Sequence, residues 1–72
     1  MTNILKLKGK IVENGLTVEE FAKSIGMDGA TLYRKMKNDG LTFSIGEANK
    51  IVTTLGLTPG DAMAIFFSDL IA

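Results

Sequence analysis

The chain has 72 residues, with eight Lys or Arg balanced by eight Asp or Glu, so it is long enough for one domain with one core and carries no net charge. It contains no Cys and no His, which excludes a disulfide framework, thiolate or imidazole metal sites, and Cys or His nucleophiles and bases. We therefore expect one domain over residues 1–72 that has no catalytic residue, metal, cofactor or small-molecule ligand and is not an enzyme.

The N-terminal stretch MTNILKLKGKIVENG is apolar in part, but Lys6, Lys8 and Lys10 interrupt it. A signal peptide or a membrane span needs an uninterrupted apolar run, which this stretch lacks. The sequence therefore predicts a cytoplasmic protein with no membrane partner.

Strand signals are weak, whereas helical patterns with their own start and stop residues recur five times. The first pattern follows Asn3, which can cap a helix, and ends before Gly15, which can stop one. The apolar residues expected on its buried face are Ile4, Leu7, Ile11 and Val12.

The second pattern starts with a capping box, in which Thr17 is followed three residues later by Glu20. Gly26 can end this helix in a left-handed conformation, and a single residue separates it from Asp28, which can cap the next helix. The link is short enough to require a tight turn. Leu16 is expected to pack across the first cap, and the buried stripe is expected to be Val18, Phe21, Ala22 and Ile25.

The third pattern covers roughly residues 29–38 and has a narrow apolar seam. Leu32 and Met36 are four residues apart and are expected to face the core. The same geometry places Tyr33, Arg34 and Lys37 on the outside. On pattern alone, these could be an ordinary solvated face.

The fourth and fifth helices are predicted after the polar turn NDGLT. Ser44 and Glu47 form a second capping box, and Gly56 ends the fourth helix. Thr58 then caps the fifth helix, with Pro59 at its first position. The expected core residues of the two helices are Ile45 or Ala48, then Ile51, Val52, Leu55, Ala62, Ile65 and Phe66.

The C-terminal run AMAIFFSDLIA is too apolar for one buried stripe. Two interpretations remain open at this point. Either the segment closes over the core of a small domain, or Phe67, Leu70 and Ile71 form a self-complementary dimer patch.

The second and third helices have the features of a helix-turn-helix: Ala22 at the crossing, Gly26 in the turn, and Leu32 one turn into the second helix. The stretch GLTVEEFAKSIGMDGATLYRKM and the later IVTTLGLTPGDA resemble the lambda-type phage repressor and Cro family. The resemblance covers roughly residues 4–67. It is closest in style to short regulators of Gram-positive prophages, in which LYRKM and a terminal FF recur.

The resemblance implies an all-α, compact five-helix domain of the lambda repressor type that binds double-stranded operator DNA and regulates transcription. It places the third helix in the major groove, as in a Cro-like or small repressor, and a homodimer formed on DNA would match two-fold operators. The implied base-reading residues are Gly29, Ala30, Thr31, Tyr33 and Arg34, and the implied phosphate contacts are Thr17, Lys35, Lys37 and Asn38.

The chain departs from the family pattern at three positions. Val18 stands where many members have a glutamine, Asp28 where Ser or Thr caps the recognition helix, and Lys35 where an aliphatic residue is usual. Val18, Asp28 and the zero net charge favour an alternative function. In that alternative, the fold serves as a protein-binding module, such as an antirepressor or a regulator's partner, with weak or no DNA binding.

Overall fold

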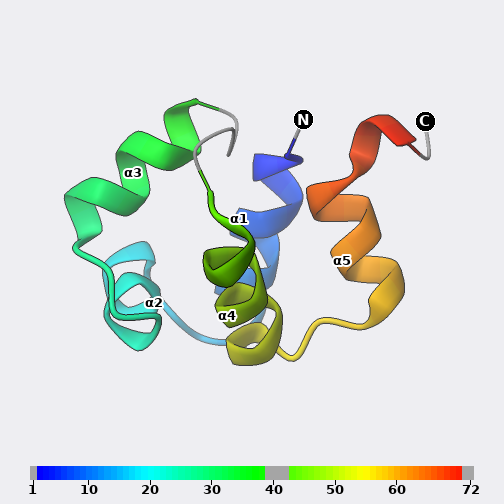
Figure 1. Cartoon of the computed structure of the whole chain (residues 1–72). Coiled ribbons are helices and arrows are strands. Elements are labelled where there is room, and N and C mark those ends of the chain that lie inside the picture. The colour runs from blue at the N-terminus through cyan, green and yellow to red at the C-terminus, as the bar shows by residue number, and fades with distance from the viewer. Residues whose placement is uncertain (1, 39–42, 71–72) are drawn as a thin grey trace.

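The computed structural model describes residues 2–38 and 43–70. Over these residues the chain forms five α-helices followed by one 3₁₀-helix, with no strand, which confirms the predicted all-α fold (Figure 1). Residues 39–42 of the predicted turn NDGLT and Ile71 lie outside the described residues. The elements are α1 (Ile4–Glu13), α2 (Val18–Ser24), α3 (Gly29–Lys37), α4 (Ile45–Leu55), α5 (Pro59–Phe66) and η1 (Ser68–Leu70).

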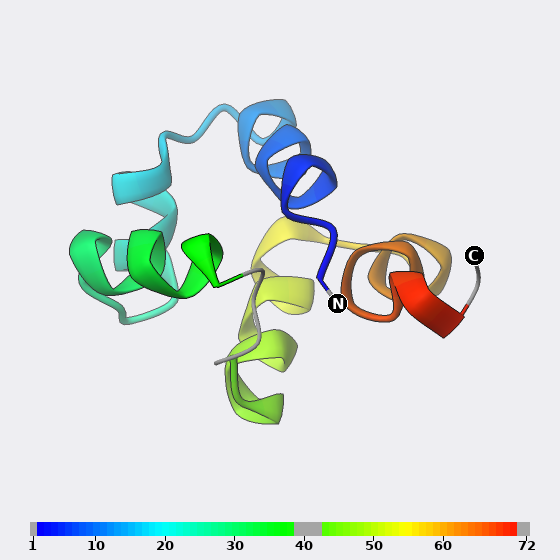
Figure 2. The same cartoon turned by 90° about the horizontal axis from the view of Figure 1, so that it is seen from above.

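The helices α2 and α3 lie together on one side of the molecule, and α5 lies on the opposite side. Figures 1 and 2 both show α1 and α4 between these two sides. The chain start is fixed to α5, because the Asn3 N–H donates to the Ile65 carbonyl at 2.7 Å. All five helices contribute to one core, formed by Leu7, Ile11, Phe21, Ala22, Ile25, Leu32, Met36, Ile51, Leu55 and Ile65.

The predicted helix starts, except that of α3, are formed by side-chain caps. In both capping boxes the hydroxyl accepts from the third helical N–H, and the Glu carboxylate accepts from the cap N–H at 2.8 Å, between Thr17 and Glu20 and between Ser44 and Glu47. Asn3 caps α1 in the same sense. Local sequence therefore sets the helix boundaries, and packing sets their arrangement.

Two expectations about buried side chains are corrected by the structure. Val12 was expected on the buried face of α1, but 71% of it is exposed, because α1 packs along the narrower seam of Leu7 and Ile11. Of the two candidates on α4, Ile45 is 84% exposed and Ala48 is half-buried. Ile45 is the first residue of its helix and lies beyond the edge of the core.

One ion pair joins the first and last α-helices. Lys10 Nζ lies 3.3 Å from Asp61 Oδ2, and the hydrogen bond that Lys10 donates to Asp61 raises the pKa of Lys10 above its ordinary value. Within the part of the chain that the structure describes, none of the helices is both long and apolar enough for a membrane span.

Candidate nucleic-acid interface

The turn between α2 and α3 is closed by backbone hydrogen bonds. The Met27 N–H donates to the Ala22 carbonyl at 2.8 Å, and the Gly26 N–H donates to the Lys23 carbonyl at 3.0 Å. This pattern is the Schellman motif, which requires a left-handed residue, and Gly26 supplies it with φ of +71°. The backbone therefore ends α2 before Gly26 and starts a tight turn toward α3.

Buried side chains hold α3 against the rest of the fold. Leu32 is fully buried and Met36 is 4% exposed, as their spacing predicted. The two helices approach closely at Gly29, where an added Cβ would lie 3.5 Å from Glu19 Cγ. That distance is an ordinary van der Waals contact, so the packing itself leaves room for a small side chain at Gly29.

The opposite face of α3 is open to solvent. Ala30, Arg34 and Lys37 follow one another at helical spacing and are all exposed. Tyr33 beside them is 47% exposed, and the half-buried Thr31 accepts a hydrogen bond of 3.4 Å from Arg34 Nη2. The predicted base-reading residues therefore share a face or border it, on a helix whose other side is buried.

The start of α3 differs from the expected cap. Asp28 has the extended backbone of an N-cap residue, with φ of −72° and ψ of 141°, but its side chain makes no capping hydrogen bond. The prediction that the Asp28 carboxylate caps α3 was therefore wrong. The amides of the first turn of α3 are left without that side-chain acceptor, and the carboxylate stays exposed beside them.

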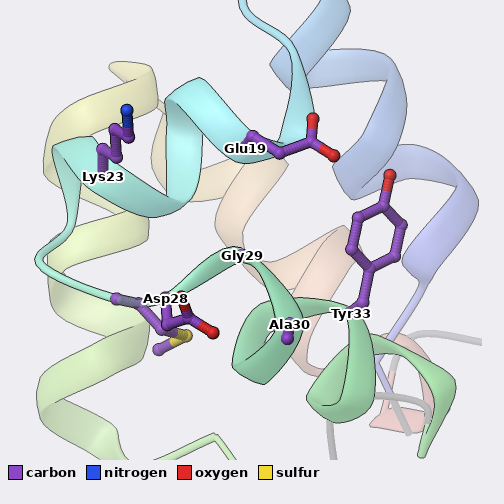
Figure 3. Close-up of a pocket in the computed structure, with 7 residues that line it drawn as sticks. Glu19, Lys23, Asp28, Gly29, Ala30 and Tyr33 are labelled. Carbon is purple, nitrogen blue, oxygen red and sulfur yellow. The ribbon is translucent and has the colours of Figure 1, made fainter.

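A hollow of about 560 Å³ lies between α2 and the start of α3 (Figure 3). The Tyr33 ring rises from α3 toward α2, beside the carboxylate of Glu19, while Lys23 extends from the other end of α2. Glu19 and Lys23 were not predicted as site residues from the sequence. Their four-residue spacing on the exposed side of α2 was the signal that could have identified them.

The four predicted phosphate-contact residues fall into two groups. Thr17, Lys37 and Asn38 are exposed, and the Thr17 hydroxyl also accepts the Glu20 N–H at 3.1 Å. Lys35 instead turns toward α4, where its Nζ lies 3.1 Å from Glu47 Oε1. The structure thus brings Lys35 to a neighbouring helix.

Glu47 holds two donors at once in this arrangement. The backbone hydrogen bond from Ser44 lowers the pKa of Glu47, and the nearby ammonium of Lys35 lowers it further, against partial burial that raises it. This pair was not predicted from the sequence. The signal was a lysine in a position usually occupied by an aliphatic residue, which indicates a side chain directed back toward the fold.

Phe67 and Leu70 do not close over the core, although Ile65 is buried in it and Phe66 packs against it. Phe67 is 51% exposed and Leu70 is 75% exposed, so the first of the two interpretations is wrong for these residues. Phe67 also lines an apolar groove of about 330 Å³ between α4 and α5. Ile71, the third predicted member of the patch, lies outside the described residues.

Comparison with known families identifies the type of domain that contains α2 and α3. Residues 6–67 match the family model of the Cro/C1-type HTH DNA-binding domain. The chain belongs to this family. The predicted resemblance is confirmed at that level, and α2 and α3 are the helix-turn-helix of a Cro/C1-type DNA-binding domain. No curated protein and no solved structure matches the chain significantly.

Proposed function

We propose that this Cro/C1-type domain is a sequence-specific transcriptional regulator, a Cro-like or small repressor of phage or prophage origin, that inserts α3 into the major groove of its operator. The observation that supports this most directly is the exposed row of Ala30, Arg34 and Lys37 on a helix whose far side is buried. A helix presented in this way can place side chains against base edges while α2 lies across the backbone.

Each side chain has a role that follows from its chemistry. The guanidinium of Arg34 can bind a guanine through two hydrogen bonds, and the methyl groups of Ala30 and Thr31 can pack on a thymine methyl. Gly29 and Tyr33 border this face and belong to the proposed base-reading surface. Phosphate contact is assigned to Thr17, Lys37 and Asn38, which are exposed near the ends of α2 and α3.

The domain acts, in this proposal, as a homodimer that assembles on DNA. The exposed Phe67 and Leu70 offer apolar side chains for such a contact. A two-fold dimer would read two half-sites about one helical turn apart. Sedimentation of the protein alone and with a two-fold duplex tests this, with a monomer expected alone and a dimer expected on the duplex.

A second candidate function is a protein-binding module that retains the fold with weak or no DNA binding. It is favoured by the carboxylates of Glu19 and Asp28 beside the start of α3, which would repel phosphates, and by Val18, whose side chain cannot donate to one. In this case the exposed groove between α4 and α5 would contact another regulator.

Chromatography on immobilised random-sequence duplex at low salt distinguishes the two functions. A phosphate-binding surface retains the protein until added salt releases it, because phosphate contact displaces counterions. We expect retention and salt elution. Passage through the column without retention would contradict DNA binding and support the protein-binding module.

A further inference from the structure

Lys35 and Glu47 join the recognition helix to α4 through one shared oxygen atom. Glu47 Oε1 accepts the Ser44 N–H at 2.8 Å to close the capping box of α4, and Lys35 Nζ lies 3.1 Å from the same atom. The two side chains are only 20% and 27% exposed. The carboxylate is therefore held in place by its own helix before it binds the lysine.

The position of this pair on α3 determines what it can do. Leu32 and Met36 lie close to one line along the buried side of α3. Their burial keeps the helix attached to the core, but two contacts on one line restrain rotation of the helix about its axis only weakly. Successive residues differ by about 100° around a helix. Lys35 therefore lies on the side of α3 between the buried seam and Arg34. The contact of Lys35 with Glu47, which we call the tether, opposes rotation of α3 about its axis from this position.

We propose, on the basis of the proposed DNA-binding function, that Lys35 is a positioning residue whose contact with Glu47 fixes the rotation of the recognition helix and so aims Arg34 at its base pair. Lys35 does not contact a phosphate in this arrangement. The capping box of α4 thereby gains a second role, since the glutamate that starts α4 also orients α3.

Two substitutions weaken the pair from opposite sides. Glu47→Gln removes the charge but keeps an oxygen that can accept the Ser44 N–H, because Gln also completes a capping box. Lys35→Met keeps the length and apolar stem of the side chain. Lys37→Met is the matched control, because Lys37 is an exposed lysine two residues away on the same helix.

The variants and their double mutant are tested for binding to two duplexes over a salt series. One duplex is the tightest sequence recovered from a random-sequence library, and the other is a scrambled sequence of equal composition. We expect Lys35→Met and Glu47→Gln each to weaken binding to the selected duplex by about threefold to tenfold, with no additional loss in the double mutant. Binding to the scrambled duplex and the salt dependence stay unchanged.

The control behaves differently if the proposal is right. Lys37→Met weakens binding to both duplexes and reduces the slope of log affinity against log salt by about one. The proposal is overturned if Lys35→Met behaves like Lys37→Met while Glu47→Gln binds as the wild type does. It is equally overturned if both substitutions leave the selected duplex unaffected.

A measurement without DNA separates this proposal from the proposed function. In the free protein, Lys35→Met and Glu47→Gln should shift the amide resonances of residues 30–37 in the same pattern, because both weaken the same tether. Failure of the wild type to bind either duplex would overturn the DNA-binding function. Unchanged α3 resonances in both variants would overturn the tether, whatever the protein binds.

Discussion

Replacing Arg34 by alanine should reduce the selectivity of DNA binding and leave the fold almost unchanged. The Arg34 side chain is exposed, and its hydrogen bond to Thr31 is long, at 3.4 Å. Surface substitutions of this kind change the free energy of unfolding by less than about 0.5 kcal/mol, and alanine is a slightly better helix former than arginine. A loss of binding can therefore be assigned to the interface.

The loss is expected to be specific to sequence. A side chain that makes two hydrogen bonds to a guanine contributes about 1–3 kcal/mol of discrimination against other bases. Arg34→Ala should weaken binding to the preferred duplex by that amount and relax the preference at one base pair. Lys37→Ala is the control, since an exposed lysine assigned to a phosphate should weaken binding to all sequences alike.

Fluorescence anisotropy with the selected duplex, its single base-pair variants and a random duplex, at one fixed salt concentration, measures both effects. If Arg34 reads a base, Arg34→Ala should reduce the difference in binding affinity between the selected and random duplexes. Equal losses of affinity for the two kinds of duplex would refute that assignment. Arg34 would then contribute only its positive charge, which attracts DNA of any sequence.

Further predictions concern the stability of the fold. Leu32→Ala removes a fully buried side chain and should lower the free energy of unfolding by about 2–5 kcal/mol in denaturant titrations, whereas a loss below about 1 kcal/mol would contradict its role in anchoring α3. Gly26→Ala should destabilise the fold by about 1–2 kcal/mol, because the φ of Gly26 is +71°, whereas Gly9→Ala inside α1 should stabilise it by about 0.5–1 kcal/mol. Shifts of the melting temperature in the same direction for both variants would contradict this. Backbone hydrogen bonds lower the pKa values of Glu20 and Glu47, so their stabilising contribution is complete above the ordinary glutamate pKa of about 4.5 and is lost as the pH falls through their lower folded values. The melting temperature should therefore fall as the pH is lowered from 6 to 3, and it should fall less steeply in the Glu20→Gln, Glu47→Gln double variant. Equal dependence of the melting temperature on pH in the two proteins would contradict the linkage.

The parts of the fold that depend on neighbouring residues could be predicted from the sequence. A capping box needs only a hydroxyl and a glutamate three residues apart, so Thr17 with Glu20 and Ser44 with Glu47 identified two helix starts. The tight turn followed from the position of Gly26 directly after the apolar stripe of α2. Leu32 and Met36 were identified by spacing alone, because a short amphipathic helix has only one apolar seam.

The parts that depend on tertiary contact could not be predicted in this way. Whether Val12 or Ile45 is buried depends on how far a neighbouring helix extends, which a periodic pattern does not encode. Asp28 has the residue type and backbone of a cap, but the rotamer of its side chain is set by its surroundings. Lys35 and Glu47 are twelve residues apart on separate helices, so only the packing of α3 near α4 brings them together.

The central claim is that the exposed face of α3 is a DNA-binding surface. Titration of isotope-labelled protein with a short mixed-sequence duplex at low salt, followed by added salt, tests it most directly by NMR. The proposed function predicts amide shifts at Thr17, in residues 29–34 and at Lys37, which reverse as salt rises because phosphate contacts are lost. Absence of shifts up to a large excess of DNA would contradict the claim and direct attention to a protein partner for the groove between α4 and α5.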